Sequence, residues 1–315
     1  MPGFRGGRLH QIDVSGTAGR LSLDMDERIR RRRDMMRLMP ELPEVEAVRR
    51  RLEPAMRGAR ITRVLLRRKG LRRPFPRAFA SRLEGRRIRS VDRRGKYLLI
   101  ALDSGDTLLM HLGMSGSFRI GRGATRRKSA AAGTRTRHDH VVFTLSNGVV
   151  LTFNDPRRFG VMDVLGDGPL ASHGVFAAMG PEPLEPSFGG AALARALAGK
   201  RVALKVALLD QRIVAGLGNI YASEALHRAG LSPLRRSSTL ATTAGRPAPG
   251  GVRLAVAIKA VLREAIARKE HPGRAGRFRV YDREGEPCRT PGCRGTIRRI
   301  SQAGRSTFYC PACQR

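Results

Sequence analysis

The sequence predicts an α+β protein of several domains: an amino-terminal β-sandwich with flanking helices, a helical domain, and a small cysteine-bearing module at the carboxyl end. Three observations lead to this prediction. Short β-type runs separated by turn residues fill positions 60–165. Runs with helical spacing come after a turn-rich segment at Pro181–Gly190. All four cysteines stand in the last 28 of 315 residues, a length that suffices for two or three domains.

Composition narrows the classes of function. Lys and Arg total 61 against 26 Asp and Glu, which gives a formal net charge of +35. A share of this charge is attributable to an arginine-rich genome, but arginine forks also match phosphate oxygens, so we expect a nucleic-acid partner. The sequence has no run of about 18 apolar residues and no Trp, so we expect neither a membrane span nor a membrane partner. We expect a monomer.

Residues 1–39 differ in composition from the rest of the chain. Met1–Asp24 is rich in Gly, Ser and Arg without sustained periodicity, and Arg28–Arg33 is a run of charge. A disordered tail would look the same, but we interpret the segment as a leader that the active protein lacks. Several later start codons are present, at Met25, Met35, Met36 and Met39.

Pro40 and Glu41 depend on that interpretation. If the chain starts at Met39 and the methionine is removed, Pro40 carries a free secondary amine beside a carboxylate, which pairs a nucleophile with a proton donor. If the chain starts at Met1, the Pro40 nitrogen is an imide without nucleophilic character. An α-amine has a pKa near ~8, so part of it is neutral at neutral pH, unlike a lysine near ~10.4.

The amino-terminal domain is predicted to open on a helix and continue as strands. The helix starts at Leu42, with Pro43 in its first turn and a stop at Gly58. Asn147-Gly148 predicts a hairpin between two strands, and the Arg/Gly/Ala-rich stretch Ile120–Thr136 is expected to be a mobile loop. The predicted strands are Ile61–Leu66, Ile88–Val91, Tyr97–Leu102, Thr107–His111, Val141–Leu145, Val149–Phe153 and Gly160–Val164.

After the linker, helices are predicted at Ala191–Ala198, Leu204–Leu209, Ala222–Ala229 and Val252–Ala267. The glycine-rich turn Gly216–Tyr221 precedes one of them. It could be a generic connection between helices, but exposed backbone amides together with Asn219 would also make a phosphate cradle. The domain boundaries expected from these patterns are 40–180, 188–270 and 278–315.

The cysteines carry the most specific pattern. Cys288-x4-Cys293-x16-Cys310-x2-Cys313 has the spacing of a zinc ribbon, in which two tight loops each supply two thiolates to one Zn²⁺. Clustering in two close pairs favours metal over disulfides. Because four ligands fill the tetrahedron, the site is expected to be structural and to hold a hairpin around Gly304–Thr307.

Five motifs occur in order along the chain: Pro40–Glu46, His111–Ser117, Asp155–Gly160, Gly216–Leu226 and Gly304–Gln314. Together they resemble the formamidopyrimidine-DNA glycosylase family of bifunctional base-excision repair enzymes, and the resemblance runs from Met39 to the last residue. It implies a catalytic β-sandwich, a helix–two-turns–helix DNA-binding domain and a zinc ribbon, with damaged double-stranded DNA as partner in a bacterial cytoplasm, near the nucleoid.

The resemblance also implies roles for individual residues. Pro40 corresponds to the nucleophile that forms a Schiff base and Glu41 to the acid beside it, while Lys96 and Arg305 correspond to the residues for β- and δ-elimination. The residues implied in contact with DNA are His138, Arg157, Lys200 and Asn219, and those implied in the wedge that fills the space of an extruded nucleotide are Met114, Arg157 and Phe159.

Each implied role has a plainer alternative. Met114 could be core, and Lys96 and Lys200 could be solvated surface charges. The triplet His138-Asp139-His140 could suggest a metal site, but alternation on a strand would put Asp139 on the face opposite both His residues.

Two features depart from the family pattern. The first cysteine pair has four intervening residues where two are usual, and the segment Lys269–Arg279 is shorter than in many relatives, where a loop closes over an oxidised purine. We therefore expect formamidopyrimidines, abasic sites or further-oxidised bases to be handled better than 8-oxoguanine. The alternatives are an endonuclease VIII-like enzyme for oxidised pyrimidines, a non-catalytic zinc-ribbon DNA-binding protein if the leader is retained, and a basic ribosome-associated protein.

Overall fold

The computed structural model describes residues 40–122, 135–242, 244–270 and 278–315. The expected leader, most of the loop expected at Ile120–Thr136, and residues 271–277 of the short segment lie outside the described residues. The described chain begins with helix α2 (Leu42–Met56), which starts where the sequence predicts. Its apolar face, with Val45, Leu52 and Met56, is buried in the core of the β domain.

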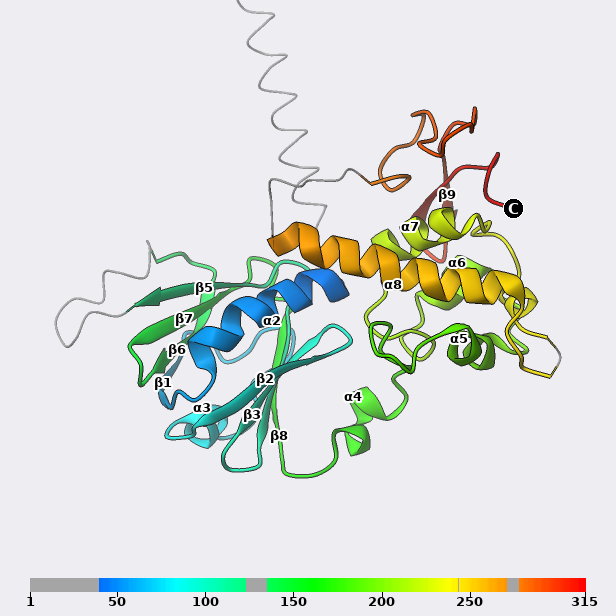
Figure 1. Cartoon of the computed structure of the whole chain (residues 1–315). Helices are drawn as coiled ribbons and strands as arrows, with labels where there is room; N and C mark the ends of the chain where they lie inside the picture. The colour runs from blue at the N-terminus through cyan, green and yellow to red at the C-terminus, as the bar shows by residue number, and fades with distance from the viewer. Residues whose placement is uncertain (1–39, 123–134, 243, 271–277) are drawn as a thin grey trace, which may run out of the picture. The chain divides into compact units, whose positions relative to one another are not determined.

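Two four-stranded antiparallel sheets form the β domain (Figure 1). One sheet has the order β1-β6-β7-β5 and the other the order β2-β3-β4-β8. Apolar residues from both sheets share one core, so the predicted sandwich is confirmed. The strands are β1 Ile61–Leu66, β2 Ile88–Arg94, β3 Tyr97–Leu102, β4 Thr107–His111, β5 Ser117–Arg122, β6 Asp139–Leu145, β7 Val149–Asn154 and β8 Val161–Leu165.

Strand β5 and helix α3 (Phe79–Leu83) are absent from the sequence prediction. Strand β5 pairs with β7 at the end of its sheet, with Phe118 opposite Phe153. The expected loop began at Ile120, which was wrong for residues 120–122. Gly121 and two arginines give this edge strand too few buried side chains for an alternating pattern to appear, and its pairing partner supplies the stability.

The 3-10 turn η1 (Leu170–Ser172) and helix α4 (Gly174–Ala177) precede the linker, and Phe176 of α4 packs against Leu99 and Leu109 of the β domain. The helical part comes after the linker and has its own core. Its helices are α5 Gly190–Leu197, α6 Leu204–Leu208, α7 Asn219–Ala229 and α8 Pro249–Glu270, with the 3-10 turn η2 Ser237–Leu240. Leu42, the first residue of α2, belongs to this second core, and its backbone N–H donates to the carbonyl of Gly216 at 3.1 Å. The start of α2 is therefore pinned to the turn before α7.

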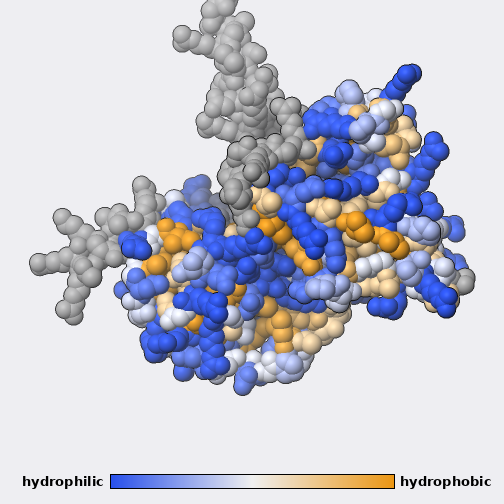
Figure 2. All heavy atoms as spheres, viewed as in Figure 1, coloured by the Kyte–Doolittle hydropathy of each residue, from blue (hydrophilic) through white to orange (hydrophobic). Residues whose placement is uncertain are grey.

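The carboxyl-terminal module is a two-stranded antiparallel hairpin, β9 (Arg298–Gln302) and β10 (Arg305–Tyr309), as the sequence predicts. Ala303 and Gly304 both adopt positive φ at its turn, the geometry that a tight two-residue hairpin needs. Within the described ranges, no helix combines the length and apolar composition that crossing a bilayer requires. Figure 2 shows hydrophilic side chains over much of the visible face of the described chain.

Candidate active site and metal centre

Glu41 lies at the amino-terminal end of helix α7. Its side chain is buried, 3% exposed, and its carboxylate accepts hydrogen bonds from the backbone N–H of Ile220 at 2.9 Å and of Tyr221 at 3.4 Å. A helix amino terminus carries a partial positive charge and unpaired N–H groups, so it favours an acidic group there. The expectation that these amides are exposed to hold a phosphate was wrong, because the turn is buried and Glu41 occupies it.

Gly218 makes this contact possible. A Cβ at Gly218 would stand 2.3 Å from Cδ of Glu41. Its φ of −132° is open to any residue, so the requirement is one of space. Glycine is needed here because the carboxylate packs directly on the backbone.

Glu44 also links the start of α2 to α7. Its carboxylate accepts hydrogen bonds from the backbone N–H of Glu41 at 3.0 Å and from the hydroxyl of Tyr221 at 2.7 Å. Burial, together with Glu44, raises the pKa of Tyr221, so the phenol stays protonated and donates. Pro40, which directly precedes Glu41, is also buried.

Lys96 reaches the same place from the turn between β2 and β3. Burial lowers the pKa of its ammonium group, the charge of Glu41 opposes that shift, and Arg305 adds to it. Burial raises the pKa of Glu41, and Lys96 is the largest opposing influence. Lys96 therefore lies close enough to Glu41 and to Arg305, both far away in sequence, for their charges to shift its pKa.

Glu182 fixes the Lys96 turn, and the sequence analysis missed it. Its carboxylate accepts from Arg93 at 2.8 Å, from Arg94 at 3.1 Å and from the backbone N–H of Gly95. Gly95 has a φ of +56° and is crowded by the side chain of Met179, so the turn is tightly packed. The sequence signals for this contact were an acidic residue in the predicted linker and two consecutive arginines, Arg93 and Arg94, just before Lys96.

Lys205 is a second residue that the sequence analysis missed. It is fully buried in α6, and its ammonium group donates to the amide oxygen of Asn219, to the carbonyl of Ser306 at 3.2 Å and to the hydroxyl of Thr307 at 2.8 Å. Burial and Arg305 lower its pKa to about 8. The amide nitrogen of Asn219 also donates to the carbonyl of Ser306, at 3.0 Å. One buried cation thus ties α6 and α7 to the strand that carries Arg305.

The expected wedge residues come from two loops that are locked together. The backbone N–H of Arg157 donates to Oγ of Ser115 at 3.1 Å, next to Met114. Phe159 is 39% exposed, and the guanidinium of Arg157 stands 4.8 Å from its ring centroid. Asp155, fully buried, accepts from the hydroxyl of Ser115 and from the backbone N–H of Gly160 at 2.8 Å. Asp155 was not singled out from the sequence, although it opens one of the five motifs.

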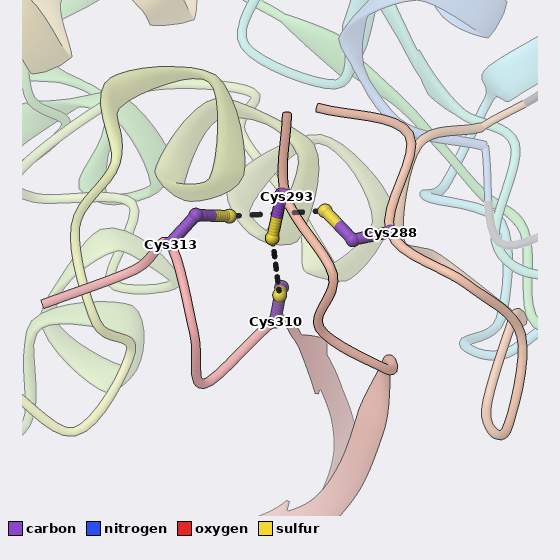
Figure 3. A group of neighbouring side chains, drawn as sticks. All are labelled: Cys288, Cys293, Cys310 and Cys313. Carbon is purple, nitrogen blue, oxygen red and sulfur yellow. Dashed lines mark hydrogen bonds between the residues drawn. The ribbon is translucent and has the colours of Figure 1, made fainter. Parts of the chain in front are cut away.

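The four cysteines converge as the spacing predicts. Their Sγ atoms all lie within 4.8 Å of one another and point toward a common centre (Figure 3). Cys288 and Cys313 are 3.8 Å apart and Cys293 and Cys310 are 3.7 Å apart, measured between Sγ atoms. A tetrahedral Zn²⁺ with bonds of about 2.3 Å separates its sulfur ligands by about 3.8 Å, so the cluster fits zinc. Hydrogen bonds from Thr290 and His227 outweigh burial and lower the pKa of the Cys288 thiol to about 6.

Comparison with known proteins places these features in one family. The amino-terminal domain of formamidopyrimidine-DNA glycosylase matches residues 39–162, its H2TH domain matches residues 179–274, and a zinc finger found in that enzyme and in IleRS matches residues 285–315. A formamidopyrimidine-DNA glycosylase from Methylocella silvestris is 54% identical over 292 residues, covering 88% of this chain and all of the relative. The chain belongs to the formamidopyrimidine-DNA glycosylase family. A relative from Beijerinckia indica subsp. indica is 55% identical over 289 residues, with the same coverage.

Solved structures of the family share this fold. The MutM (Fpg) protein of Thermus thermophilus superposes with a TM-score of 0.71 at 39% identity, covering 87% of this chain and 98% of that one. Lactococcus lactis Fpg non-covalently bound to DNA containing an AP site has a TM-score of 0.73 at 30% identity, covering 88% and 100%. A MutM complex with DNA containing carbocyclic 8-oxo-G matches equally well, with a TM-score of 0.73 at 30% identity. The family's zinc finger and the converging thiolates give this chain one structural zinc site.

Two further residues of this glycosylase-family chain were expected to contact DNA, His138 and Lys200. Both are far from Glu41 in sequence. His138 and Lys200 are both partly buried. The expected alternation around Asp139 was wrong, because a register shift occurs after Asp139 in the pairing of β6 with β7. Asp139 and His140 are both buried, 3% and 1% exposed, and Asp139 binds Arg119 at 2.7 Å.

Proposed function

We propose that the protein is a base-excision DNA glycosylase with abasic-site lyase activity, which removes oxidised purines from double-stranded DNA through the amine of Pro40. The observation that carries the proposal is the buried carboxylate of Glu41, held on the amino terminus of α7 directly after Pro40 and charge-coupled to Lys96. Family membership supports the substrate class.

In the proposed reaction, the neutral amine of Pro40 attacks C1′ of the damaged nucleoside. Glu41 acts as the acid that protonates the ring oxygen O4′ as the sugar opens, and the bond from C1′ to the base breaks. Burial raises the pKa of Glu41 and so favours the protonated form that this role needs. The product is a cationic iminium, because the attacking amine is secondary.

The iminium then drives the strand cuts. Its positive charge acidifies the proton on C2′, whose removal expels the 3′ phosphate by β-elimination, and a second elimination expels the 5′ phosphate. A one-nucleotide gap flanked by phosphates results. We assign Lys96 to the first elimination and Arg305 to the second. The zinc supplies no step, and its four thiolates hold the hairpin that carries Arg305.

DNA contacts complete the proposal. A damaged base must leave the stack to be attacked, and we assign Met114, Arg157 and Phe159 to the vacated space, which implies a kink in the DNA. Exposure of Phe159 under the Arg157 guanidinium supports this role. His138, Arg157 and Lys200 are assigned to contact DNA.

We also assign Asn219 to contact a DNA phosphate, on one condition. Its amide already contacts Lys205 and Ser306, so a phosphate would have to displace or share one of these partners. We keep the domain boundaries 40–180, 188–270 and 278–315 as part of the proposal, together with a monomer that works on nucleoid DNA.

Lesion choice is the finer part of the proposal. The seven positions 271–277, which lie outside the described residues, are all that connects α8 to Phe278. Formamidopyrimidines and abasic sites are therefore proposed as better substrates than 8-oxoguanine. Single-turnover excision rates on matched duplexes test this, and 8-oxoguanine opposite cytosine as the fastest substrate would contradict it.

Covalent trapping tests the activity itself. Protein beginning at Pro40 is incubated with duplex DNA bearing a formamidopyrimidine or an abasic site, borohydride is added, and the adduct is mapped by mass spectrometry. We expect a DNA adduct on the Pro40 nitrogen. A protein that binds the duplex and yields no adduct with any lesion is a binding module, and preference for oxidised pyrimidines would favour an endonuclease VIII-like enzyme.

A further inference from the structure

His227 stands against the zinc site from the last turn of helix α7. Its side chain is buried, 4% exposed, and its Nε2 lies 3.4 Å from Sγ of Cys288 and 3.9 Å from Sγ of Cys313. Its other ring nitrogen, Nδ1, is buried and has no hydrogen-bond partner within the described residues. All polar contacts of the imidazole that the described chain supplies are therefore directed toward the zinc ribbon.

The protonation state of the zinc-bound cysteines decides which of the two partners donates the hydrogen bond. A zinc-bound thiolate has no proton and can only accept a hydrogen bond. The proton of a neutral His227 must therefore be on Nε2, which donates toward the sulfur, and Nδ1 is then unprotonated. An imidazole that fixes metal ligands through the second shell is a recurrent device, although here the metal ligand is a sulfur rather than the imidazole itself.

Thr290 extends the contact to a second cysteine. Its Oγ1 lies 3.2 Å from Nε2 of His227 and 3.7 Å from Sγ of Cys313, and its backbone N–H points to Sγ of Cys288 at 3.5 Å. Thr290 belongs to the four residues between Cys288 and Cys293, the enlarged knuckle. The enlargement thus supplies a hydroxyl that can accept from His227 and donate to Cys313.

Helix α7 consequently contacts the zinc ribbon near both of its ends. At its first residue, Asn219 donates to the carbonyl of Ser306, beside Arg305, and in its last turn His227 reaches Cys288. The two residues are eight positions apart, or about 12 Å along the helix axis. Between these two ends, the carboxylate of Glu224 accepts from the backbone N–H groups of Arg279, Val280 and Tyr281, so the ribbon is held at several points along the helix. His227 is the contact that reaches Cys288.

We propose that His227 is a positioning residue of the zinc site. Its single Nε2–H is shared between the Cys288 thiolate and Oγ1 of Thr290, the Thr290 hydroxyl donates to the Cys313 thiolate, and together they slow zinc loss and help to hold the ribbon on α7. This role is independent of the glycosylase chemistry. It requires the hydrogen-bond donor itself, whereas a merely structural role for His227 would require only its volume.

Two substitutions at position 227 distinguish the effect of the hydrogen-bond donor from the effect of side-chain volume. His227→Phe keeps an aromatic ring and removes the donor, whereas His227→Gln places an amide N–H near the position of Nε2. Full-length zinc-loaded protein is challenged with a chromophoric chelator. We expect His227→Phe to lower zinc affinity by about 10–100-fold, the usual effect of losing an outer-shell partner, and His227→Gln to restore most of it.

Cobalt substitution gives a spectroscopic measurement that does not depend on activity. A hydrogen bond stabilises the sulfur lone pairs, so its loss moves the thiolate-to-cobalt charge-transfer band to lower energy. We expect this red shift in His227→Phe and little shift in His227→Gln. Leu226→Met, a neighbouring buried position of α7 outside the cysteine cluster, controls for disturbed packing.

Thr290→Val keeps the test decisive if His227→Phe fails to fold. It removes the hydroxyl at nearly constant volume and should give a smaller red shift and a smaller loss of zinc affinity. Unchanged affinity and unchanged cobalt spectra in both His227→Phe and Thr290→Val would overturn the proposal. So would equal defects in His227→Phe and His227→Gln, because volume alone would then explain them.

Discussion

At the scale of single residues, Glu41 combines two demands that normally conflict. As an acceptor of two backbone N–H groups at a helix terminus it is stabilised as an anion, yet burial raises its pKa and favours the acid. Lys96 opposes that rise. This balance suits the proton-donor role proposed for Glu41, because the same carboxyl group can carry a proton and keep its position after releasing it.

Glu41→Gln tests the proton-donor role. The Gln carbonyl can still accept from Ile220, so the fold should persist, but the amide cannot supply the proton. We expect single-turnover excision of a formamidopyrimidine to fall by about 10²–10⁴-fold. Cleavage at a preformed abasic site should fall less, because that sugar opens without base departure. Equal loss of both activities would contradict the assignment.

His111 gives a prediction about pH. Burial, with Lys96 and Arg72 nearby, lowers its pKa from 6.5 to about 4, and its Nδ1 accepts from the backbone N–H of Gly113 at 3.0 Å. Because the folded pKa lies below the unfolded one, the unfolded state binds more protons between these values. The stabilisation is present above pH 6.5 and is lost as pH falls toward 4.

We expect the free energy of unfolding to drop by at most about 3 kcal/mol over that window from this group. His111→Asn keeps an acceptor near Nδ1 and does not titrate, so this component of the pH dependence should disappear. Denaturant unfolding at several pH values measures it, with His138→Asn at a partly buried site outside the β4 strand as control. An unchanged pH profile in His111→Asn would rule the explanation out.

At the scale of elements, the sequence predicted individual strands better than their partners. Ile61–Leu66, Tyr97–Leu102 and Thr107–His111 have the predicted bounds, because each is a continuous β-type run ended by turn residues. The Asn147-Gly148 hairpin between β6 and β7 is confirmed. Strand β5 was missed since pairing with β7, more than its own composition, stabilises it.

The junction of α2 and α7 can be tested at Gly218. In Gly218→Ala the new Cβ would collide with the Glu41 carboxyl, so we expect Glu41 to leave the helix terminus. Excision should fall at least as far as in Glu41→Gln, and stability by about 1–3 kcal/mol as buried N–H groups lose their acceptor. Excision assays and thermal unfolding measure the two effects.

Gly189 provides a matched control, since it also precedes a helix with an extended φ and a Cβ there would meet nothing within 4 Å. Gly189→Ala therefore carries the same change in cap preference without the collision. If the two variants lose activity to the same extent, the steric argument at Gly218 is wrong.

At the scale of the whole molecule, the proposed active site forms where three distant segments meet. The start of α2 supplies Glu41, the β2–β3 turn supplies Lys96, and the zinc-bound hairpin supplies Arg305. Lys205 and Glu182 hold two of these segments in place from the helical part and from the linker. None of these pairings is visible as a local pattern.

In the proposed reaction, the amino terminus decides whether that site can react. We expect a chain that retains Met1 to bind lesion-bearing duplex but to yield no borohydride adduct and no strand cut, because the Pro40 nitrogen is then an imide. A chain that begins at Pro40 should do all three. Gel-shift, cleavage and intact-mass measurements on both forms check this, and efficient cutting by protein proven to keep Met1 would refute it.

The sequence alone determined the α+β class, the zinc ribbon, the family resemblance and the identity of the candidate residues, because each rests on local spacing and residue type. It did not reveal that Glu41 binds the turn expected to cradle a phosphate, that Lys205 and Glu182 bind the segments carrying Arg305 and Lys96, or that His227 contacts Cys288. Those facts depend on contacts between residues up to about 180 positions apart. Only the packed tertiary structure decides which distant donor meets which acceptor, since burial leaves each polar group to find its partner among whatever the fold brings beside it.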